Sequence, residues 1–375
     1  MKFNKLNSFF SYINNNLKGQ KLNSKIVVIE SDDWGAIRMP NKKVFEILSN
    51  LGIPVQNSVY CKFDTLESND DVSCLLETLS SVKTREGQSP KLTANFVVSN
   101  PDFKKMQEFE LSKYFFEPIS ETYNRLTGHD KVLSIINQGM SENLVLPQFH
   151  GRDHINVPLW LELIKTNKDF KLAFDLGLWG LSKDVYPKME KSIQATYDSL
   201  DIDYCNTSIQ EGLTLFEIIF GFKSKSFIAN NYIWPTEIEN ILFNGGVMHI
   251  QGMNYHLLPL NNNKNYHNKE RIYLGYRNNL GMTYGVRNCS FEPIACNDNS
   301  DKTLFQIKNA FLLKKPAIIN THRINFSGGM NKVIRDKNLN EFKNLIKNIV
   351  LKWPDVKFMT SAELGNYLNE SRNTQ

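Results

Sequence analysis

Short apolar runs alternate with longer amphipathic stretches along nearly the whole chain. The first run, residues 26–29, consists of β-branched residues and predicts a strand that is buried on both faces. Similar runs predict strands at residues 92–98, 144–149, 170–176, 226–229, 247–250, 317–320 and 356–359. Between them, apolar residues at helical spacing predict helices at residues 42–51, 64–82, 213–220, 238–243, 304–313 and 339–351.

This alternation predicts an α/β fold, with a parallel sheet and helices on its outside. The chain has 375 residues and no linker composition, so we expect a single distorted (β/α) barrel of about seven strands. The expected organisation is an N-terminal helical extension at 1–24 and a barrel at 25–365. Two stretches with weak periodicity, 181–204 and 261–285, are expected to be insertions in the barrel.

Composition narrows the class of protein. A hydrophobic content of 41% and a charged content of 22% are typical of a soluble globular protein. The formal net charge of +5 comes from scattered lysines, so no nucleic-acid partner is expected. The 5 cysteines form no C-x-x-C pair, which favours reduced thiols in a cytosolic protein.

The N-terminal residues lack an apolar run long enough for a signal peptide or a transmembrane segment. We therefore expect a cytoplasmic protein. Apolar residues do recur at helical spacing within 1–20, with Lys and Asn between them. We expect this helix to pack on the outside of the domain, and the alternative is weak contact with a membrane surface.

Two adjacent carboxylates, Asp32 and Asp33, follow the first predicted strand. In α/β folds the carboxyl ends of the strands carry the chemistry. Two like charges at this spacing repel each other unless a cation or hydrogen-bond donors compensate them, and a bound metal ion would do so. The alternative is that the pair solvates a turn or caps a helix.

Two histidines, His150 and His154, follow the predicted strand 144–149, and Asn156 and Pro158 then favour the start of a helix. An Asp with two His is a common ligand set for a catalytic divalent metal. Because both motifs follow strands, we expect them at the same edge of the sheet, where they form a metal site. His322 follows strand 317–320 and is either a ligand, a general acid or a structural histidine.

Other side chains beside these motifs are candidates for orienting the substrate. Three arginines are expected to orient carboxylates: Arg38, Arg152 and Arg323. Three aromatic residues are expected either to form a wall for sugar rings or to pack in the core: Trp34, Tyr232 and Trp234. The chain contains no G-x-G-x-x-G, P-loop or G-x-S-x-G, which argues against dinucleotide, nucleotide and serine-hydrolase sites.

In order, the motifs are a strand followed by Asp-Asp, an H-x-x-x-H after a later strand, and a late strand that ends in His. Over about residues 25–365 this order resembles the polysaccharide deacetylases with a NodB-homology domain. The chain is most similar to a divergent bacterial branch in which I-E-S-D-D-W-G, F-H-G-R-x-H and T-H-R-x-N recur.

This resemblance implies a distorted barrel and the removal of acetyl groups from N-acetylated sugars with a divalent metal. Zinc is the first expectation, with cobalt, manganese or nickel as alternatives. The resemblance makes Asp32 the catalytic base and His322 the acid that protonates the leaving amine. It makes Asp33, His150 and His154 the metal ligands.

The chain also departs from the family. The family's third motif carries an Arg that pairs with the base, but the corresponding strand end here has Asn230 and Asn231. We therefore expect Arg38, Arg152 or Arg323 to substitute for it, and a backbone N–H near Tyr232 to bind the oxyanion. The family's Asp that tunes the acid His is not evident.

Three other functions are compatible with these residues. One is a metal hydrolase that cleaves another C–N bond, such as that of a cyclic amide or ureide. Another is a metal-free glycosidase that uses two carboxylates. The third is a catalytically inactive carbohydrate-binding barrel, which the missing Arg suggests.

Overall fold

The computed structural model describes residues 17–260 and 267–371. Most of the amphipathic pattern at 1–20, namely residues 1–16, and residues 261–266 of the 261–285 stretch lie outside the described residues. The described part of the expected helical extension, residues 17–24, contains no helix. Among the described residues, no helix is both long and apolar enough to cross a bilayer.

The centre of the molecule is one parallel sheet whose strands run in the order β10-β7-β6-β5-β2-β1-β12-β11, with β13 also paired to β1. The strands are β1 (Ile26–Trp34), β2 (Leu92–Phe96), β5 (Val145–Phe149), β6 (Ser226–Phe227), β7 (His249–Ile250), β10 (Thr283–Tyr284), β11 (Cys289–Ser290), β12 (Ala317–His322) and β13 (Lys357–Met359).

This order confirms the predicted distorted (β/α) barrel. From β1 through β10 the neighbours in the sheet follow chain order, and β11 and β12 return to the other side of β1. The two end strands, β10 and β11, both lie in the described part of the chain and are not hydrogen-bonded to each other. The barrel is therefore open at one seam, and residues 285–288 cross that seam.

Strand β1 is the centre of the sheet and is buried along its whole length. Along one edge it pairs with β12, from Val27 beside Ala317 to Asp32 beside His322. The first half of its other edge pairs with β13 and the second half with β2. A strand with neighbours on both edges and helices over the sheet must be apolar on both faces, which explains the β-branched run that predicted it.

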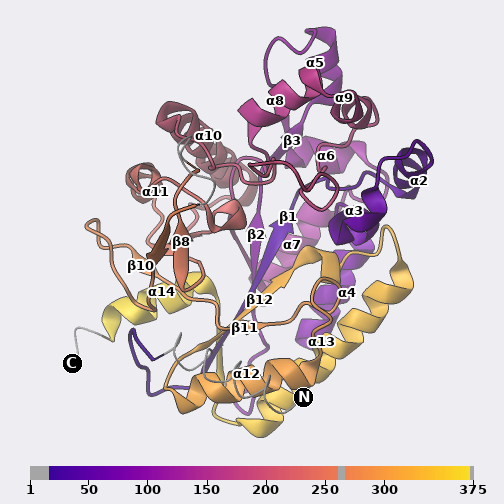
Figure 1. The fold of residues 1–375 in the computed structure, drawn as a ribbon. Coiled ribbons are helices and arrows are strands. Elements are labelled where there is room, and N and C mark those ends of the chain that lie inside the picture. The colour runs from indigo at the N-terminus through magenta and orange to yellow at the C-terminus, as the bar shows by residue number, and fades with distance from the viewer. Residues whose placement is uncertain (1–16, 261–266, 372–375) are drawn as a thin grey trace.

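Helices surround the sheet (Figure 1). They are α2 (Lys42–Asn50), α3 (Val59–Phe63), α4 (Asn69–Ser80), α5 (Phe103–Glu108), α6 (Ile119–Arg125), α7 (Val132–Ser141), α8 (Val157–Thr166), α9 (Lys168–Asp175), α10 (Ile202–Phe220), α11 (Glu239–Asn244), α12 (Ser300–Leu312), α13 (Lys332–Lys352) and α14 (Ser361–Glu370). As predicted, the Asn156 side chain caps α8 by accepting from the Leu159 N–H, and Pro158 lies in the first turn.

Two small antiparallel sheets lie outside the barrel. One pairs β3 (Ser99–Pro101) with β4 (Phe116–Pro118), and the other pairs β8 (Tyr255–Leu257) with β9 (Lys269–Arg271).

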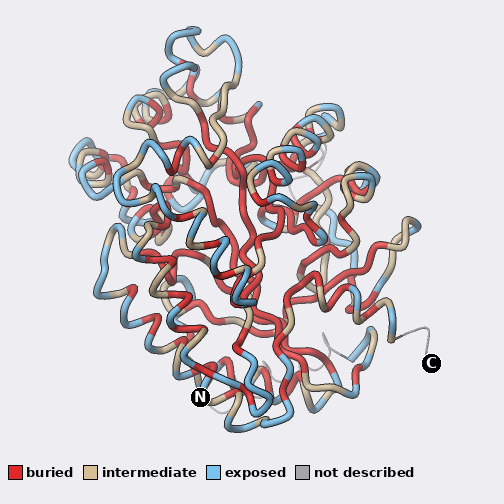
Figure 2. The backbone as a smooth tube through the Cα atoms, turned by 180° about the vertical axis from the view of Figure 1, so that it is seen from behind, coloured by how far each residue is buried: buried red, intermediate tan, exposed pale blue. Residues whose placement is uncertain are grey.

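Two apolar clusters hold the molecule together. The larger one lies between the sheet and the surrounding helices, and in Figure 2 its buried segments run through the middle of the molecule. The smaller one joins α2, α8 and α9 to the segment 178–193. Figure 1 shows α8 and α9 at the end toward which the β1 arrow points. The second cluster therefore covers the carboxyl ends of the strands, and much of the predicted 181–204 insertion belongs to it.

The strand predicted at 170–176 is wrong, because this stretch is helix α9. Its buried residues are Phe170, Ala173 and Phe174, a spacing of three and four that matches one face of a helix. Asn167 caps the helix by accepting from the Asp169 N–H. A short apolar run fits either element, and here packing against α8 decides for the helix.

Candidate metal and catalytic site

The two carboxylates at the end of β1, Asp32 and Asp33, line one cavity but point in different directions. Side chains alternate along a strand, so Asp32 faces the same way as Glu30, whereas Asp33 faces the opposite way. Asp33 has a left-handed backbone, with φ of 73°, which is rare outside glycine. The pair therefore makes different contacts, and repulsion between the two carboxylates is relieved by different partners.

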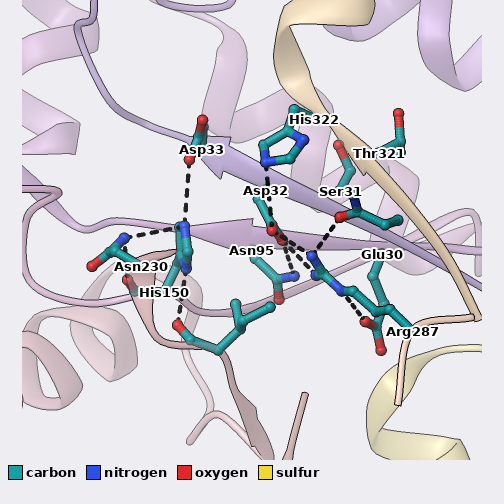
Figure 3. A network of polar contacts seen from close by, with 12 residues as sticks. Glu30, Ser31, Asp32, Asp33, Asn95, His150, Asn230, Arg287, Thr321 and His322 are labelled. Carbon is teal, nitrogen blue, oxygen red and sulfur yellow. Dashed lines mark hydrogen bonds and ion pairs between the residues drawn. The ribbon is translucent and has the colours of Figure 1, made fainter. Parts of the chain in front are cut away.

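Asp33 meets the two predicted histidines. Its Oδ1 lies 3.0 Å from His154 Nε2 and 3.4 Å from His150 Nε2. One ligand atom from each of these three buried residues lies within 4.8 Å of the other two. Figure 3 shows His150 reaching toward Asp33 from the strand beyond Asn95.

The protonation of the two rings suits a metal ligand. His150 Nδ1 lies 2.9 Å from the Ile228 carbonyl oxygen, so Nδ1 carries the proton and Nε2 keeps its lone pair. Burial lowers the pKa of His154 to about 4 despite the nearby Asp33, so this ring is neutral at pH 7. One carboxylate and two imidazoles are the donor set that a catalytic divalent ion takes, and the residues fit such an ion.

Arg38 holds the other oxygen of Asp33. Its Nη2 donates to Asp33 Oδ2 over 2.9 Å. Burial alone would raise the pKa of Asp33, but Arg38 and the histidines hold it well below the usual value. The carboxylate is thus ionised, and one of its oxygens stays turned toward the two rings.

Arg287, which the sequence analysis did not single out, holds Asp32. Its Nη1 and Nη2 donate to the two carboxylate oxygens over 2.6 and 2.7 Å. Asn95 Nδ2 donates to Asp32 Oδ1 over 2.7 Å, and Arg287 Nε donates to the buried Glu30 over 2.6 Å. Burial would raise the pKa of Asp32, but Arg287 lowers it far below the usual value, so Asp32 is ionised.

The expectation that Arg38, Arg152 or Arg323 would pair with the base was therefore wrong. Arg287 comes from the open seam between β10 and β11, and its backbone N–H donates to the carbonyl of Gly252, which follows β7. Figure 3 shows its side chain lying between Glu30 and Asp32.

His322 lies on the other side of Asp32. Its Nδ1 is 2.6 Å from Glu292 Oε1, and its Nε2 is 3.9 Å from Asp32 Oδ2. Burial would lower the pKa of His322, but Glu292 raises it to about 9 together with the acidic pair. The ring is therefore an imidazolium at neutral pH, with its Nε2 proton on the side of Asp32. Glu292 takes the place of the tuning carboxylate that the sequence did not make evident.

These groups surround one cavity of about 460 Å³ at the carboxyl ends of the strands. Its lining contains Asp32, Asp33, Arg38, Tyr60, His150, His154, Gln194, Ala229, Asn231, Tyr232, Met253, Asn320 and His322. All five predicted catalytic and metal residues are in this lining, as are Arg38 and Tyr232. The Tyr232 N–H, however, donates to the Ala229 carbonyl over 3.0 Å, so it is not free to bind an oxyanion.

Four other predicted residues are not in this lining. Trp34 is buried and donates from Nε1 to Ser31 Oγ. Trp234 is buried and stacks on His256, with ring centroids 3.6 Å apart. The structure thus places both tryptophans in the packing of the molecule, which was the alternative considered for them.

The two remaining arginines make ion pairs elsewhere. Arg152 pairs with Asp153 and Glu211. Arg323 is fully buried and pairs with Asp64 and Glu67. Neither side chain lines the cavity.

No family model matches the chain, and no curated protein matches it. Solved structures do match it at low identity. A probable polysaccharide deacetylase from Pseudomonas aeruginosa PAO1 matches with a TM-score of 0.46 and 10% identity, over 94% of this chain and 93% of that one. A putative glycoside hydrolase/deacetylase from Parabacteroides distasonis matches with a TM-score of 0.48 and 8% identity, over 94% and 73%.

Polysaccharide deacetylases are among the structures that this chain resembles. A 4-alpha-glucanotransferase from Thermococcus litoralis also matches, with a TM-score of 0.43 and 10% identity over 92% of this chain. The chain spans only 40% of that structure. At these identities and TM-scores the matches carry no information about activity, so the function has to rest on the site itself.

Proposed function

We propose that this protein is a metal-dependent hydrolase that removes the acetyl group from an N-acetylated sugar. The products are acetate and a free amine. One observation carries the proposal: a ligand set for a divalent ion, an ionised carboxylate and a protonated histidine share one cavity. Hydrolysis of an unactivated amide needs all three, because water must be activated, the carbonyl polarised and the leaving nitrogen protonated.

The metal ligands are Asp33 Oδ1, His150 Nε2 and His154 Nε2. A divalent ion held there, with zinc expected and cobalt, manganese or nickel as alternatives, supplies Lewis-acid polarisation of the amide carbonyl and acidifies the attacking water. Arg38 and the Ile228 carbonyl hold these ligands in place from outside.

Asp32 is the general base. Its carboxylate accepts a proton from the water that adds to the amide carbon. Arg287 and Asn95 fix the orientation of the carboxylate and keep it ionised, so the base is ready at neutral pH.

His322 is the general acid. Its Nε2 gives a proton to the amide nitrogen as the C–N bond breaks, so the nitrogen leaves as a neutral amine. The proton on Asp32 balances the one lost by His322, whose Nε2 lies 3.9 Å from Asp32 Oδ2. Glu292 holds Nδ1 and thereby directs the reactive proton into the cavity.

Metal content and acetate release test this proposal. We expect about one divalent ion per purified chain by elemental mass spectrometry. We expect acetate release from N-acetylglucosamine or its oligomers, lost on chelation and restored by zinc. The proposal fails if the metal-loaded protein releases no acetate from a panel of N-acetylated sugars. Turnover of a cyclic amide or ureide would favour the other C–N hydrolase, and glycosidic cleavage that survives chelation would favour the glycosidase.

Glu292→Gln is expected to narrow the pH range of activity from the alkaline side. The acid must be protonated, so activity is present below the pKa of His322 and is lost as pH rises through it, at about 9. Without the carboxylate the pKa should fall to the ordinary imidazole value of about 6.5 or below. At pH 8 the variant should lose activity by at least about tenfold, whereas the loss at pH 6 should be smaller. An unchanged alkaline limb in the pH–rate profile would remove His322 as the acid.

A further inference from the structure

A series of ring contacts around the guanidinium group of Arg38 lies at one side of the cavity, with Trp179 behind the lining residues. The ring of His154 stacks on Trp179, with centroids 5.9 Å apart. Arg38 Cζ lies 5.5 Å from the Trp179 ring and 4.7 Å from the Tyr60 ring. Tyr60 in turn meets His322 edge-on at 6.0 Å. Arg38 thus lies midway along this series of contacts, which joins a metal ligand to the acid.

The guanidinium of Arg38 has donors left over. Nη2 is used by Asp33, and Nε lies 3.6 Å from Asp64 Oδ2, which is too long for a hydrogen bond. Nη1 has no partner among the described residues, although Arg38 is only 4% exposed. A buried charged donor without an acceptor is costly, so a missing group is expected to fill this position.

Gln194, like Arg38, has a buried side-chain nitrogen that makes no hydrogen bond to the described residues. It belongs to the irregular segment that covers the carboxyl ends of the strands, is 8% exposed and lines the same cavity. Within 17–260 and 267–371, its Nε2 meets no hydrogen-bond partner. Of the lining residues, only Arg38, His154 and Gln194 contain such unmet buried atoms, and all of these atoms are nitrogens. With His154 bound to a metal through Nε2, its Nδ1 also carries a proton. The unmet buried atoms of this lining are therefore donors that face no acceptor in the described part of the chain.

The charge of Arg38 is only partly neutralised by its carboxylate neighbours. Asp64 accepts two hydrogen bonds from Arg323, over 3.2 and 2.8 Å, and so divides its charge between two guanidinium groups. Asp33 divides its charge between Arg38 and the metal-ligand side. A substrate group that offers both acceptors and negative charge would complete this arrangement.

We propose that Arg38 Nη1 and Gln194 Nε2 bind an oxyanion of the substrate, a carboxylate or a phosphate, so that the substrate is an acidic sugar. The identification of that substrate as an N-acetylated sugar rests on the function proposed above. The anion subsite itself does not, because it stands on donors that neither bind the metal nor take part in proton transfer.

Ligand-detected NMR on the zinc-loaded full chain tests the subsite with two sets of probes. The first set lacks the acetamide and compares glucose with glucuronate and glucose 6-phosphate. The second compares N-acetylglucosamine with its uronate and its 6-phosphate. We expect the acidic member of each set to bind at least about tenfold more tightly, as for a charge-assisted hydrogen bond. The acid that binds more tightly identifies carboxylate or phosphate as the natural group.

Arg38→Met and Gln194→Leu should each bring the acidic and neutral probes to similar affinity. Arg85→Met, which removes an exposed arginine outside the cavity lining, should leave the preference intact. Because Arg38 also holds Asp33, metal content is measured in each variant. Where Arg38→Met has lost its ion, Gln194→Leu is the deciding test. Equal binding of acidic and neutral probes by the wild type would overturn the inference, as would a preference that survives Gln194→Leu. Failure of the deacetylase proposal would instead appear as absent acetate release while glucuronate or glucose 6-phosphate still binds preferentially.

Discussion

Asp32→Asn is expected to abolish turnover while leaving the metal content of the protein unchanged. An amide cannot accept the proton of the attacking water, and loss of a general base costs about 10² to 10⁴ in rate. The metal ligands are untouched, because Asp32 faces Arg287 and Asn95 rather than the Asp33 cluster. Acetate release and elemental mass spectrometry on the same preparation measure the two quantities.

The fold should tolerate this substitution. Arg287 keeps its bond to the buried Glu30 carboxylate, so its charge stays paired, and the new amide can still accept one of its hydrogen bonds. Thermal unfolding of both proteins provides the control. Full activity in the variant would show that Asp32 is not the base.

His150→Ala is expected to lose the metal. The substitution removes one of three ligand atoms and leaves Asp33 and His154, which are too few to hold a catalytic ion. We expect about one ion per chain in the wild type and close to none in the variant, with activity lost in parallel. Elemental mass spectrometry after dialysis measures this.

His129→Ala is the matched control, because it makes the same change at a half-buried histidine outside the cavity lining. His129 Nδ1 lies beside the Glu67 carbonyl, so the control also loses a backbone contact, as the variant does. Metal retained by His150→Ala would contradict the ligand set. A wild type that stays empty after zinc or cobalt is added would contradict the metal site as a whole.

The sequence predicted the site residues that directly follow long apolar strands. Asp32 ends a run in β1, His150 follows β5 and His322 ends β12, and parallel strands bring their carboxyl ends to one edge. In the sheet, Asp32 of β1 lies directly beside His322 of β12, as expected for the carboxyl ends of neighbouring parallel strands. The strand pattern predicted their common position, whereas their roles came from the residue types and from the resemblance to a known family.

Arg287 and Glu292 could not be found in this way. The strands beside them, β10 and β11, are each two residues long, and so short a strand leaves no alternating pattern. The few apolar residues before Arg287, within 282–286, were the only indication of a strand. Most of them lie in the 261–285 stretch, which was expected to be an insertion. Their role depends on the open seam of the barrel, which is a property of the whole sheet rather than of the local sequence.

Proximity in sequence also misled the assignment of Arg323. This residue follows His322 directly, but neighbouring side chains point to opposite sides of a strand end. His322 therefore reaches the cavity, whereas Arg323 turns away into the core and pairs with Asp64.

The pairing of β1 with β12 and β13 has a consequence for how the protein is made. Val27 is synthesised 290 residues before its partner Ala317. At about 5–20 residues per second, this delay is on the order of tens of seconds. During this interval one edge of β1 has no β12 to pair with. The carboxylates of Glu30 and Asp32 likewise lack Arg287 until that residue has been synthesised. During this delay the nascent chain exposes the apolar edge of β1 next to two carboxylates of the candidate site. A chaperone that binds extended apolar strands would be expected to bind there.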